Sequence, residues 1–191
     1  MVSAIVLAAG LARRFGSAKP LALYDGKPLV RHVVDRIQGA GVREIVVMVS
    51  QPESAYLAAL AGLRTSVRLV RVDHPELGMS RSLYIGLSVL HKRTDAVIVA
   101  LADQPTIQRA VVKSLVREWH ATRSHIVAPV YRGERGHPVL FDAAVFPELY
   151  AITGDRGARE VVERDPSRVR LIQIDTDLPK DVDTPDDLAA L

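Results

Sequence analysis

The chain has 191 residues, of which 48% are hydrophobic and 25% are charged, and its formal net charge is +3. This length fits one domain with a sizeable core, and this composition is typical of a globular protein rather than a disordered one. We therefore expect residues 1–191 to form a single domain. The absence of cysteine excludes disulfides, zinc–thiolate sites, iron–sulfur clusters and cysteine nucleophiles.

Basic residues are scattered among acidic ones along the chain. A protein that binds nucleic acid would be expected to carry a basic stripe or a known binding motif, and the sequence has neither. The first residues lack the basic segment and cleavage site of a signal peptide, and no apolar run is long enough to span a bilayer. The sequence predicts a cytoplasmic protein that binds a phosphate-rich small ligand, with no nucleic-acid partner and no membrane association.

Apolar segments rich in Val and Ile alternate with helical patterns along the chain. Several of these segments, such as IVLAA and AVIVALA, are apolar on both faces, as in strands of a parallel sheet that is covered by helices. The predicted strands are Val2–Ala9, Glu44–Ser50, Val67–Val72, Ala96–Leu101, Ser124–Pro129 and Val169–Asp175. The predicted helices are the segment from Pro28 to the stop signal at Gly39–Gly41, then Glu53–Leu60, Ser80–His91, Ile107–Thr122, Gly157–Arg164 and Pro185–Leu191.

This alternation predicts an α/β fold of the Rossmann-like, doubly wound class with a mostly parallel sheet. Residues 131–150 instead have the pattern of short, turn-rich elements, and we interpret them as a small β-ribbon insertion that caps the site. In open sheets of this class, ligands bind beyond the carboxyl ends of the strands. The loops after the strands are therefore the places to look for function.

The first predicted strand leads directly into the loop LAAGLARRFGSAKP. Gly10 and Gly16 bracket this loop and would let backbone N–H groups approach a phosphate closely. Arg14 offers a planar fork for phosphate oxygens, and Lys19 a compact cation. The alternative is an ordinary turn whose arginines are solvated. The dinucleotide-binding pattern GxGxxG and the P-loop pattern GxxxxGK[ST] are both absent. The position after a buried strand favours a triphosphate site.

Two acidic groups follow later strands. Asp103, in VALADQP, comes just past the fourth predicted strand, where a carboxylate suits Mg²⁺, although it could instead cap the next helix. The segment KDVDTPDDL follows the last strand and can return to the same edge. Within it we prefer Asp183 as the second metal ligand, with Asp181 as the alternative. Asp186 and Asp187 fall in a first helical turn, where the helix dipole explains them.

The loop motif L-A-A-G-x-x-x-R-[MF]-G-x-x-K resembles the signature of the MobA-like nucleotidyltransferases, which implies the fold of the nucleotide-diphospho-sugar transferases. The pair Ala8–Ala9 before Gly10 resembles the molybdenum cofactor cytidylyltransferase branch more than the guanylyltransferase branch. Ala12 departs from the pattern, because many members have Ser there. Similar motifs follow in the same order from Ile5 to Leu188. The resemblance also implies that Asp103 is a metal ligand.

The resemblance divides the other motifs between two substrates. HPELGMSRSLYIGL is similar to the family's nucleotide-contacting segment, and Gly86 could also allow close helix packing, which is compatible with that role. RGERGHPVLF and TGDRGAREV are similar to acceptor segments, although His137 could be structural, and Arg132, Arg135, Arg156 and Arg159 could be solvated. The predicted nucleotide-binding residues are Leu7, Ala8, Ala9, Gly10, Arg14, Gly16, Lys19, Gly78, Ser82 and Gly86. The predicted acceptor-binding residues are Gly136, His137, Gly154, Asp155 and Gly157; the catalytic residues are Arg14, Lys19 and Asp103, and the Mg²⁺ ligands are Asp103 and Asp183.

The implied reaction is transfer of CMP from CTP to the phosphate of molybdenum-bound molybdopterin, with release of pyrophosphate. A recipient molybdoenzyme is a further expected partner. Three alternatives stay open: a guanylyltransferase of the same family, a cytidylyltransferase acting on another phosphate, and a noncatalytic carrier of the molybdenum cofactor. An NAD-dependent oxidoreductase is disfavoured, because the glycine fingerprint is missing.

Overall fold

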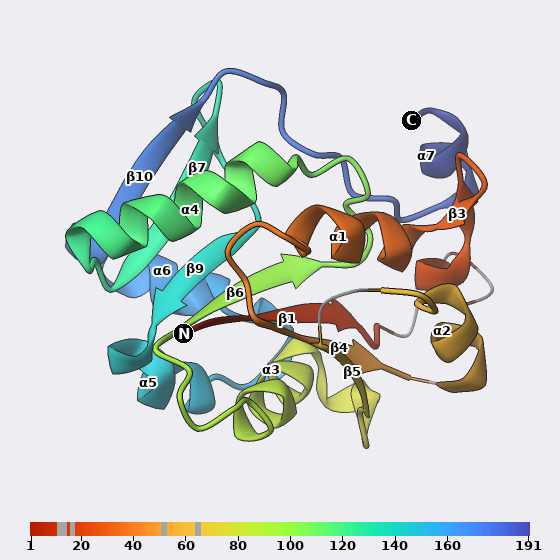
Figure 1. Cartoon of the computed structure of the whole chain (residues 1–191), viewed down its shortest axis with the longest axis horizontal. Coiled ribbons are helices and arrows are strands. Elements are labelled where there is room, and N and C mark those ends of the chain that lie inside the picture. The colour runs from red at the N-terminus through yellow and green to blue at the C-terminus, as the bar shows by residue number, and fades with distance from the viewer. Residues whose placement is uncertain (11–14, 16–17, 51–52, 64–65) are drawn as a thin grey trace.

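A computed structural model of the chain describes residues 1–10, 15, 18–50, 53–63 and 66–191 (Figure 1). Its main element is an eight-stranded sheet with the order β10-β7-β9-β6-β1-β4-β5, in which β8 pairs with β7. β8 and β9 run antiparallel to their neighbours, and the other pairs are parallel. The strands of this sheet are β1 (Val2–Ala8), β4 (Glu44–Val49), β5 (Ser66–Arg71), β6 (Ala96–Leu101), β7 (Ile126–Tyr131), β8 (Glu134–Arg135), β9 (Val139–Asp142) and β10 (Val169–Ile174).

Helices lie on both faces of this sheet, with α1 and α4 on one side and α3, α5 and α6 on the other (Figure 1). Short 3-10 turns connect them, among them η1 (Lys19–Leu21), η2 (Pro75–Leu77) and η4 (Gly154–Arg156). The α-helices are α1 (Leu29–Ile37), α2 (Glu53–Ala59), α3 (Met79–Ser88), α4 (Arg109–Thr122), α5 (Phe146–Tyr150), α6 (Arg159–Arg164) and α7 (Pro185–Ala189). None of the described helices combines the length and apolar character needed to cross a bilayer.

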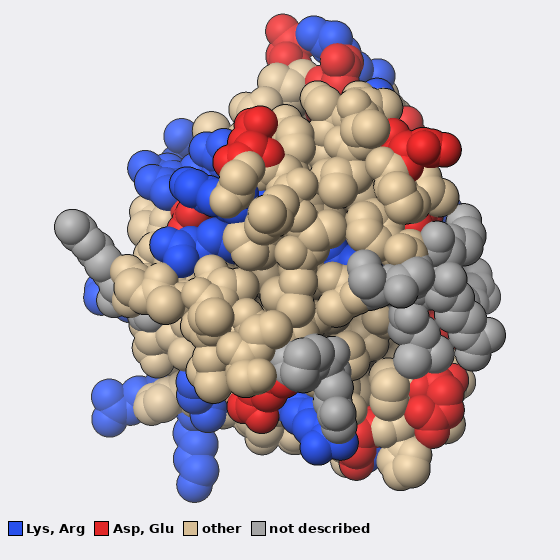
Figure 2. All heavy atoms as spheres, turned by 90° about the vertical axis from the view of Figure 1, so that its right-hand side faces the viewer, with Lys and Arg blue, Asp and Glu red and all other residues tan. Residues whose placement is uncertain are grey.

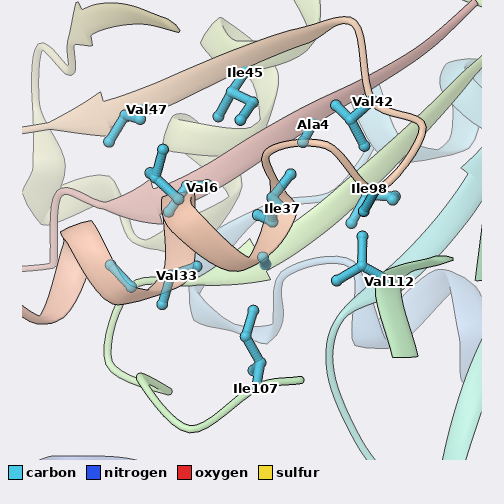
Figure 3. Close-up of a cluster of buried hydrophobic side chains, with 14 of the residues drawn as sticks. Ala4, Val6, Val33, Ile37, Val42, Ile45, Val47, Ile98, Ile107 and Val112 are labelled. Carbon is cyan, nitrogen blue, oxygen red and sulfur yellow. The ribbon is translucent and has the colours of Figure 1, made fainter. Parts of the chain in front are cut away.

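The two hydrophobic cores follow from the alternation of side chains along the central strands. Figure 3 shows part of the first core, where Ala4 and Val6 of β1 meet Val33 and Ile37 of α1. The intervening Ile5 belongs to the second core, on the face covered by α3. Because both faces of β1 are buried, only its carboxyl end is free to present a site.

The predicted strands and helices are confirmed in the predicted order along the chain, and their boundaries differ from the predicted ones by a few residues. Residues 131–150 do form short elements, among them β8, β9 and α5, but the predicted capping position needs a correction for β9. β9 does not cap the site but lies inside the main sheet between β6 and β7, because Val139–Phe141 is apolar on both faces and fills that position. The hairpin of β2 (Leu23–Tyr24) and β3 (Lys27–Pro28) was not predicted, although its Asp25–Gly26 turn is a common hairpin signal.

The strand order reverses direction at β1. From there the chain continues outward to β4 and β5 on one side, while β6 lies on the other. The connections that leave β1 and β6 therefore diverge, and a crevice opens beyond their carboxyl ends, as is general for open α/β sheets. Ala8 of β1 and Leu101 of β6 mark this edge.

Candidate active site

A cavity of about 430 Å³ opens beyond the carboxyl ends of β1 and β6. Figure 2 shows this edge of the molecule, where Lys and Arg side chains gather on one flank and the centre is largely uncharged. The described residues that line the cavity include the predicted Leu7, Ala8, Ala9, Gly10, Lys19, Gly78, Ser82 and Asp103, together with Pro20, Pro75, Glu76, Met79, Leu101, Ala102 and Asp155. Two predicted phosphate-contacting residues, Arg14 and Gly16, lie outside the described residues.

Three charged residues from distant parts of the chain meet here, and two of them, Lys19 and Asp103, line the cavity. The Nζ of Lys19 lies 2.7 Å from Oδ2 of Asp103 and 3.0 Å from Oδ1 of Asp183, and it donates a hydrogen bond to each. The Lys19 side chain is 13% exposed and that of Asp103 is 23% exposed. Burial lowers the pKa of Lys19, but the charges and hydrogen bonds of both aspartates outweigh burial, so its pKa is raised and the ammonium stays charged.

Backbone contacts hold Asp183 beside Asp103. Val182 is fully buried, and its N–H donates to the carbonyl oxygen of Asp103 at 3.0 Å. The following helix α7 begins with a capping box, in which the Thr184 hydroxyl and the Asp187 carboxylate bond reciprocally with the backbone. Asp187 therefore has the helix-start role that the sequence predicts, while Asp183 faces the ion cluster.

Asp181, the alternative metal ligand, has a different partner. Its Oδ1 accepts a hydrogen bond of 2.8 Å from Nε2 of Gln104, which is 4% exposed. Burial raises the pKa of Asp181, assisted by the negative charges of Asp103 and Asp183, against the Gln104 hydrogen bond. Of the two candidates for the second ligand, Asp183 is the one that shares a cation with Asp103.

The carboxylate pair fits a divalent metal ion. Oδ1 of Asp103 is buried and has no hydrogen-bond partner among the described residues, which leaves one hard oxygen ligand free. The described residues form no group of three or more His, Cys, Asp or Glu side chains that could hold a metal. Mg²⁺ is usually bound by one or two carboxylates plus substrate phosphates, so a pair suffices for it.

The start of α3 forms the opposite wall of the cavity. Oδ1 of Asp155 accepts a hydrogen bond of 3.2 Å from the backbone N–H of Met79, and a Cβ on Gly78 would lie 2.8 Å from the carbonyl carbon of Gly154. Gly78 has φ +90°, which favours glycine. η4 and α3 can approach this closely only because Gly78 has no side chain. The predicted acceptor residue Asp155 thus lines the same cavity as the predicted nucleotide-binding residues Gly78 and Ser82.

Gly86 is not among the described residues that line the cavity, so its predicted contact with the nucleotide stays a prediction. A Cβ at this position would lie 3.0 Å from Ile5 and 3.2 Å from the sulfur of Met48. The glycine therefore lets α3 pack closely on β1 and β4, which is the packing alternative considered above. Ser82, one turn earlier in α3, is 6% exposed and does line the cavity.

A second cavity of about 540 Å³ lies on the other side of Leu101. Gly136 and His137 line it, as do Gln104, Arg135, Arg159 and Asp181. Burial lowers the pKa of His137, so its ring is neutral, and its Nδ1 has no hydrogen-bond partner among the described residues. A smaller cavity of about 380 Å³, which both His137 and Asp155 line, lies on the α3 side.

The remaining two acceptor candidates are placed by packing on α3. Gly154 contacts Gly78, and a Cβ on Gly157 would lie 2.6 Å from the sulfur of Met79. Sequence reasoning missed Gln104 as a site residue, although it directly follows Asp103 in DQP and so shares the same strand end. The described site therefore has two compartments, separated by the residues at the end of β6.

A parallel α/β sheet with cations and carboxylates at its switch point is the arrangement of a nucleotide-binding enzyme. Residues 4–169 match the sequence model of the MobA-like NTP transferase domain, so the chain belongs to this family of nucleotidyltransferases. A protein of Pyrococcus horikoshii described as a probable molybdenum cofactor guanylyltransferase is 31% identical over 80% of this chain and 73% of its own. The bifunctional protein GlmU of Staphylococcus epidermidis is 28% identical over 64% of this chain, which spans only 27% of GlmU.

Solved structures share the fold. The crystal structure of Rv0371c from Mycobacterium tuberculosis H37Rv is 31% identical, with a TM-score of 0.85 over 99% of this chain and 96% of that one. Rv0371c is also known in a complex with manganese, at 29% identity and a TM-score of 0.83 over the same shares. The 4-diphosphocytidyl-2C-methyl-D-erythritol synthase of Anaerococcus prevotii, 14% identical with a TM-score of 0.80 over 100% of this chain and 93% of that one, shows the same fold.

Proposed function

We propose that residues 1–191 form one transferase domain that transfers CMP from CTP to the phosphate of a molybdopterin-type acceptor and releases pyrophosphate. The observation that carries this proposal is the contact of Lys19 with both Asp103 and Asp183 at the mouth of the cavity between β1 and β6. One cation and two carboxylates at this place suit a triphosphate and a metal ion. The second cavity, lined by Gly136 and His137, would take the acceptor.

The reaction requires neutralisation of the negative charges on the phosphates rather than a nucleophile from the protein. A phosphate acceptor is already an anion that can attack the α-phosphorus in line, so no general base is needed. The main obstacle is repulsion between this anion and the triphosphate. Lys19 would bind the phosphates and stabilise the charge that develops on the departing pyrophosphate. Asp103 and Asp183 would hold Mg²⁺, which supplies further neutralisation of the phosphates when bound.

The choice of CTP rests on the end of β1. Ala8 and Ala9 are 2% and 3% exposed and are among the residues that line the cavity. This Ala–Ala pair before Gly10, rather than an Ala–Gly pair, resembles the cytidylyltransferase branch and supports CTP as the donor. The competing proposal is a guanylyltransferase of the same family, and the Pyrococcus horikoshii relative favours it by its name.

One experiment tests donor and acceptor together. The protein is incubated with Mg²⁺, molybdenum cofactor and one of CTP, GTP, ATP or UTP, and the products are identified by mass. We expect a cytosine dinucleotide and pyrophosphate with CTP, and little product with the other nucleotides. A guanine dinucleotide would favour the competing proposal instead. Absence of pyrophosphate with every nucleotide would contradict both and would favour a noncatalytic carrier of the cofactor.

A further inference from the structure

The ammonium of Lys19 contacts both carboxylates that the proposed function assigns to a metal ion. It contacts Oδ2 of Asp103 at 2.7 Å and Oδ1 of Asp183 at 3.0 Å, so one cation bridges both carboxylates. A divalent ion held by the same two oxygens would lie close to this ammonium and be repelled by it. Lys19 and the metal therefore cannot both use Oδ2 of Asp103 and Oδ1 of Asp183.

We propose that Lys19 is a placeholder cation, which holds the two carboxylates in the nucleotide-free protein and leaves them when the phosphates of an NTP arrive. The metal ion then binds where the ammonium was. This inference rests on the proposed function, because it needs a triphosphate in the cavity that Lys19 lines. It goes further by making metal affinity depend on the nucleotide.

The local structure allows this exchange without a movement of the backbone. The main chain at Lys19 is held in η1, where the N–H of Ala22 donates to the Lys19 carbonyl at 3.0 Å and Pro20 is buried. The four-carbon stem of lysine is flexible, and its ammonium is a compact charge that can point to either side. A swing of this side chain alone can transfer the ammonium from the carboxylates to the cavity.

The carboxylates also have a reason to keep a cation at all times. Two carboxylates close enough to share one ammonium repel each other when both are ionised. The buried, unpartnered Oδ1 of Asp103 is not used by Lys19 and stays available as a ligand. The placeholder thus stabilises the pair before the metal ion arrives and leaves part of the coordination sphere ready.

Linkage makes this coupling measurable. If the nucleotide frees the carboxylates for the metal, the nucleotide must raise metal affinity, and the metal must raise nucleotide affinity by the same factor. Removal of the Lys19 charge should abolish the competition in the nucleotide-free protein. The clearest readout is therefore metal binding without nucleotide and without turnover.

The test is a titration of the nucleotide-free protein with Mn²⁺, in which electron paramagnetic resonance measures the free ion. We expect Lys19→Met to bind Mn²⁺ at least about tenfold more tightly than the wild type, because two charge-assisted hydrogen bonds no longer compete with it. Lys19→Arg, which keeps the charge, should bind as weakly as the wild type. Lys27→Met is the matched control, because Lys27 is 60% exposed and lies 3.9 Å from Asp35, outside the cavity.

The double variant Lys19→Met/Asp103→Asn should lose the gained affinity, which assigns the ion to this pair. The proposal is overturned if Lys19→Met binds no more tightly than the wild type, or if Lys19→Arg binds as tightly as Lys19→Met. Melting curves with and without Mn²⁺ show whether each variant folds, and a larger Mn²⁺-dependent rise in Tm for Lys19→Met is a second expected result. Failure of the proposed function would show separately, as absence of nucleotide transfer by the wild type.

Discussion

Two groups of ion pairs can be compared: the Lys19 cluster, formed by Lys19, Asp103 and Asp183, and the contact between Arg168 and Glu148. Their donor–acceptor distances are similar, but their surroundings differ. Arg168 binds Glu148 in a two-pronged contact, with Nη1 2.6 Å from Oε1 and Nη2 2.9 Å from Oε2. This contact joins η5 (Pro166–Arg168) to α5, and neither residue is among those that line the described cavities. Lys19 and Asp103 instead line a cavity, and the buried atom without a hydrogen-bond partner is a carboxylate oxygen of Asp103, whereas at Arg168 it is Nε of the guanidinium.

This difference separates an ionic contact that stabilises the fold from one that is available for chemistry. In the Arg168 contact, each carboxylate oxygen has a donor, and the planar guanidinium matches the carboxylate in shape. In the Lys19 cluster, one compact ammonium serves two carboxylates that are far apart in the sequence. The oxygen of Asp103 that is buried without a partner costs stability unless a ligand contacts it, which is typical of functional sites.

The largest effect should come from Asp103→Asn. We expect the rate of nucleotide transfer to fall by at least about a hundredfold, the scale of removing one preorganised electrostatic group. The melting temperature should change little, because the amide keeps the shape of the carboxylate and Lys19 keeps Asp183. Pyrophosphate release under saturating Mg²⁺ and CTP measures the rate. A rate close to that of the wild type would show that this cluster is structural, like the one at Arg168.

The sequence predicts the members of the Lys19 cluster because each of them follows a strand that can be recognised in the sequence. Lys19 and Asp103 come after strands that are apolar on both faces, and parallel strands bring their carboxyl ends to one edge. For the second metal ligand, the sequence gives only a weak reason to prefer Asp183 over Asp181. The deciding contacts, Gln104 with Asp181 and Val182 with Asp103, depend on how the last segment packs, which local patterns do not report.

The fold shows the same limit. Alternating strands and helices are predicted well, because their periodicity is local. The position of β9 (Val139–Asp142) is not predicted from the sequence. This short strand is placed by pairing with β6 on one side and β7 on the other, and such long-range pairing is not visible in a local pattern. For Gly86, the sequence allows ligand contact and close packing together, and the distances to Ile5 and Met48 show the close packing.

A smaller effect is expected for Glu148→Gln, which tests the Arg168 contact. Both side chains are about a quarter exposed, at 26% and 23%, so we expect a loss of about 1 kcal/mol in the free energy of unfolding at neutral pH. Nucleotide transfer should be unchanged. A loss of activity without a loss of stability would contradict the distinction between the two clusters.

The same variant has a defined pH dependence. The hydrogen bond from Arg168 lowers the pKa of Glu148 below its usual value of 4.5. A lowered folded-state pKa stabilises the fold above the unfolded value, and this contribution disappears as pH falls through the folded pKa. The difference in the free energy of unfolding between wild type and Glu148→Gln should therefore have its full value at neutral pH and decrease below about pH 4.5. Urea unfolding at several pH values measures it.

The smallest effect should come from Asp177→Asn. Asp177 contacts Nη1 of Arg132 at 2.7 Å, a distance close to that of the Lys19–Asp103 contact, but the two side chains are 87% and 58% exposed. Water screens this pair, so we expect the free energy of unfolding to change by less than about 0.5 kcal/mol and the rate of transfer to stay the same. Urea unfolding beside Glu148→Gln measures the difference. A loss as large as that of Glu148→Gln would show that exposure does not set the strength of ionic contacts in this chain, and the comparison with Arg168 would then have to rest on hydrogen-bond geometry alone.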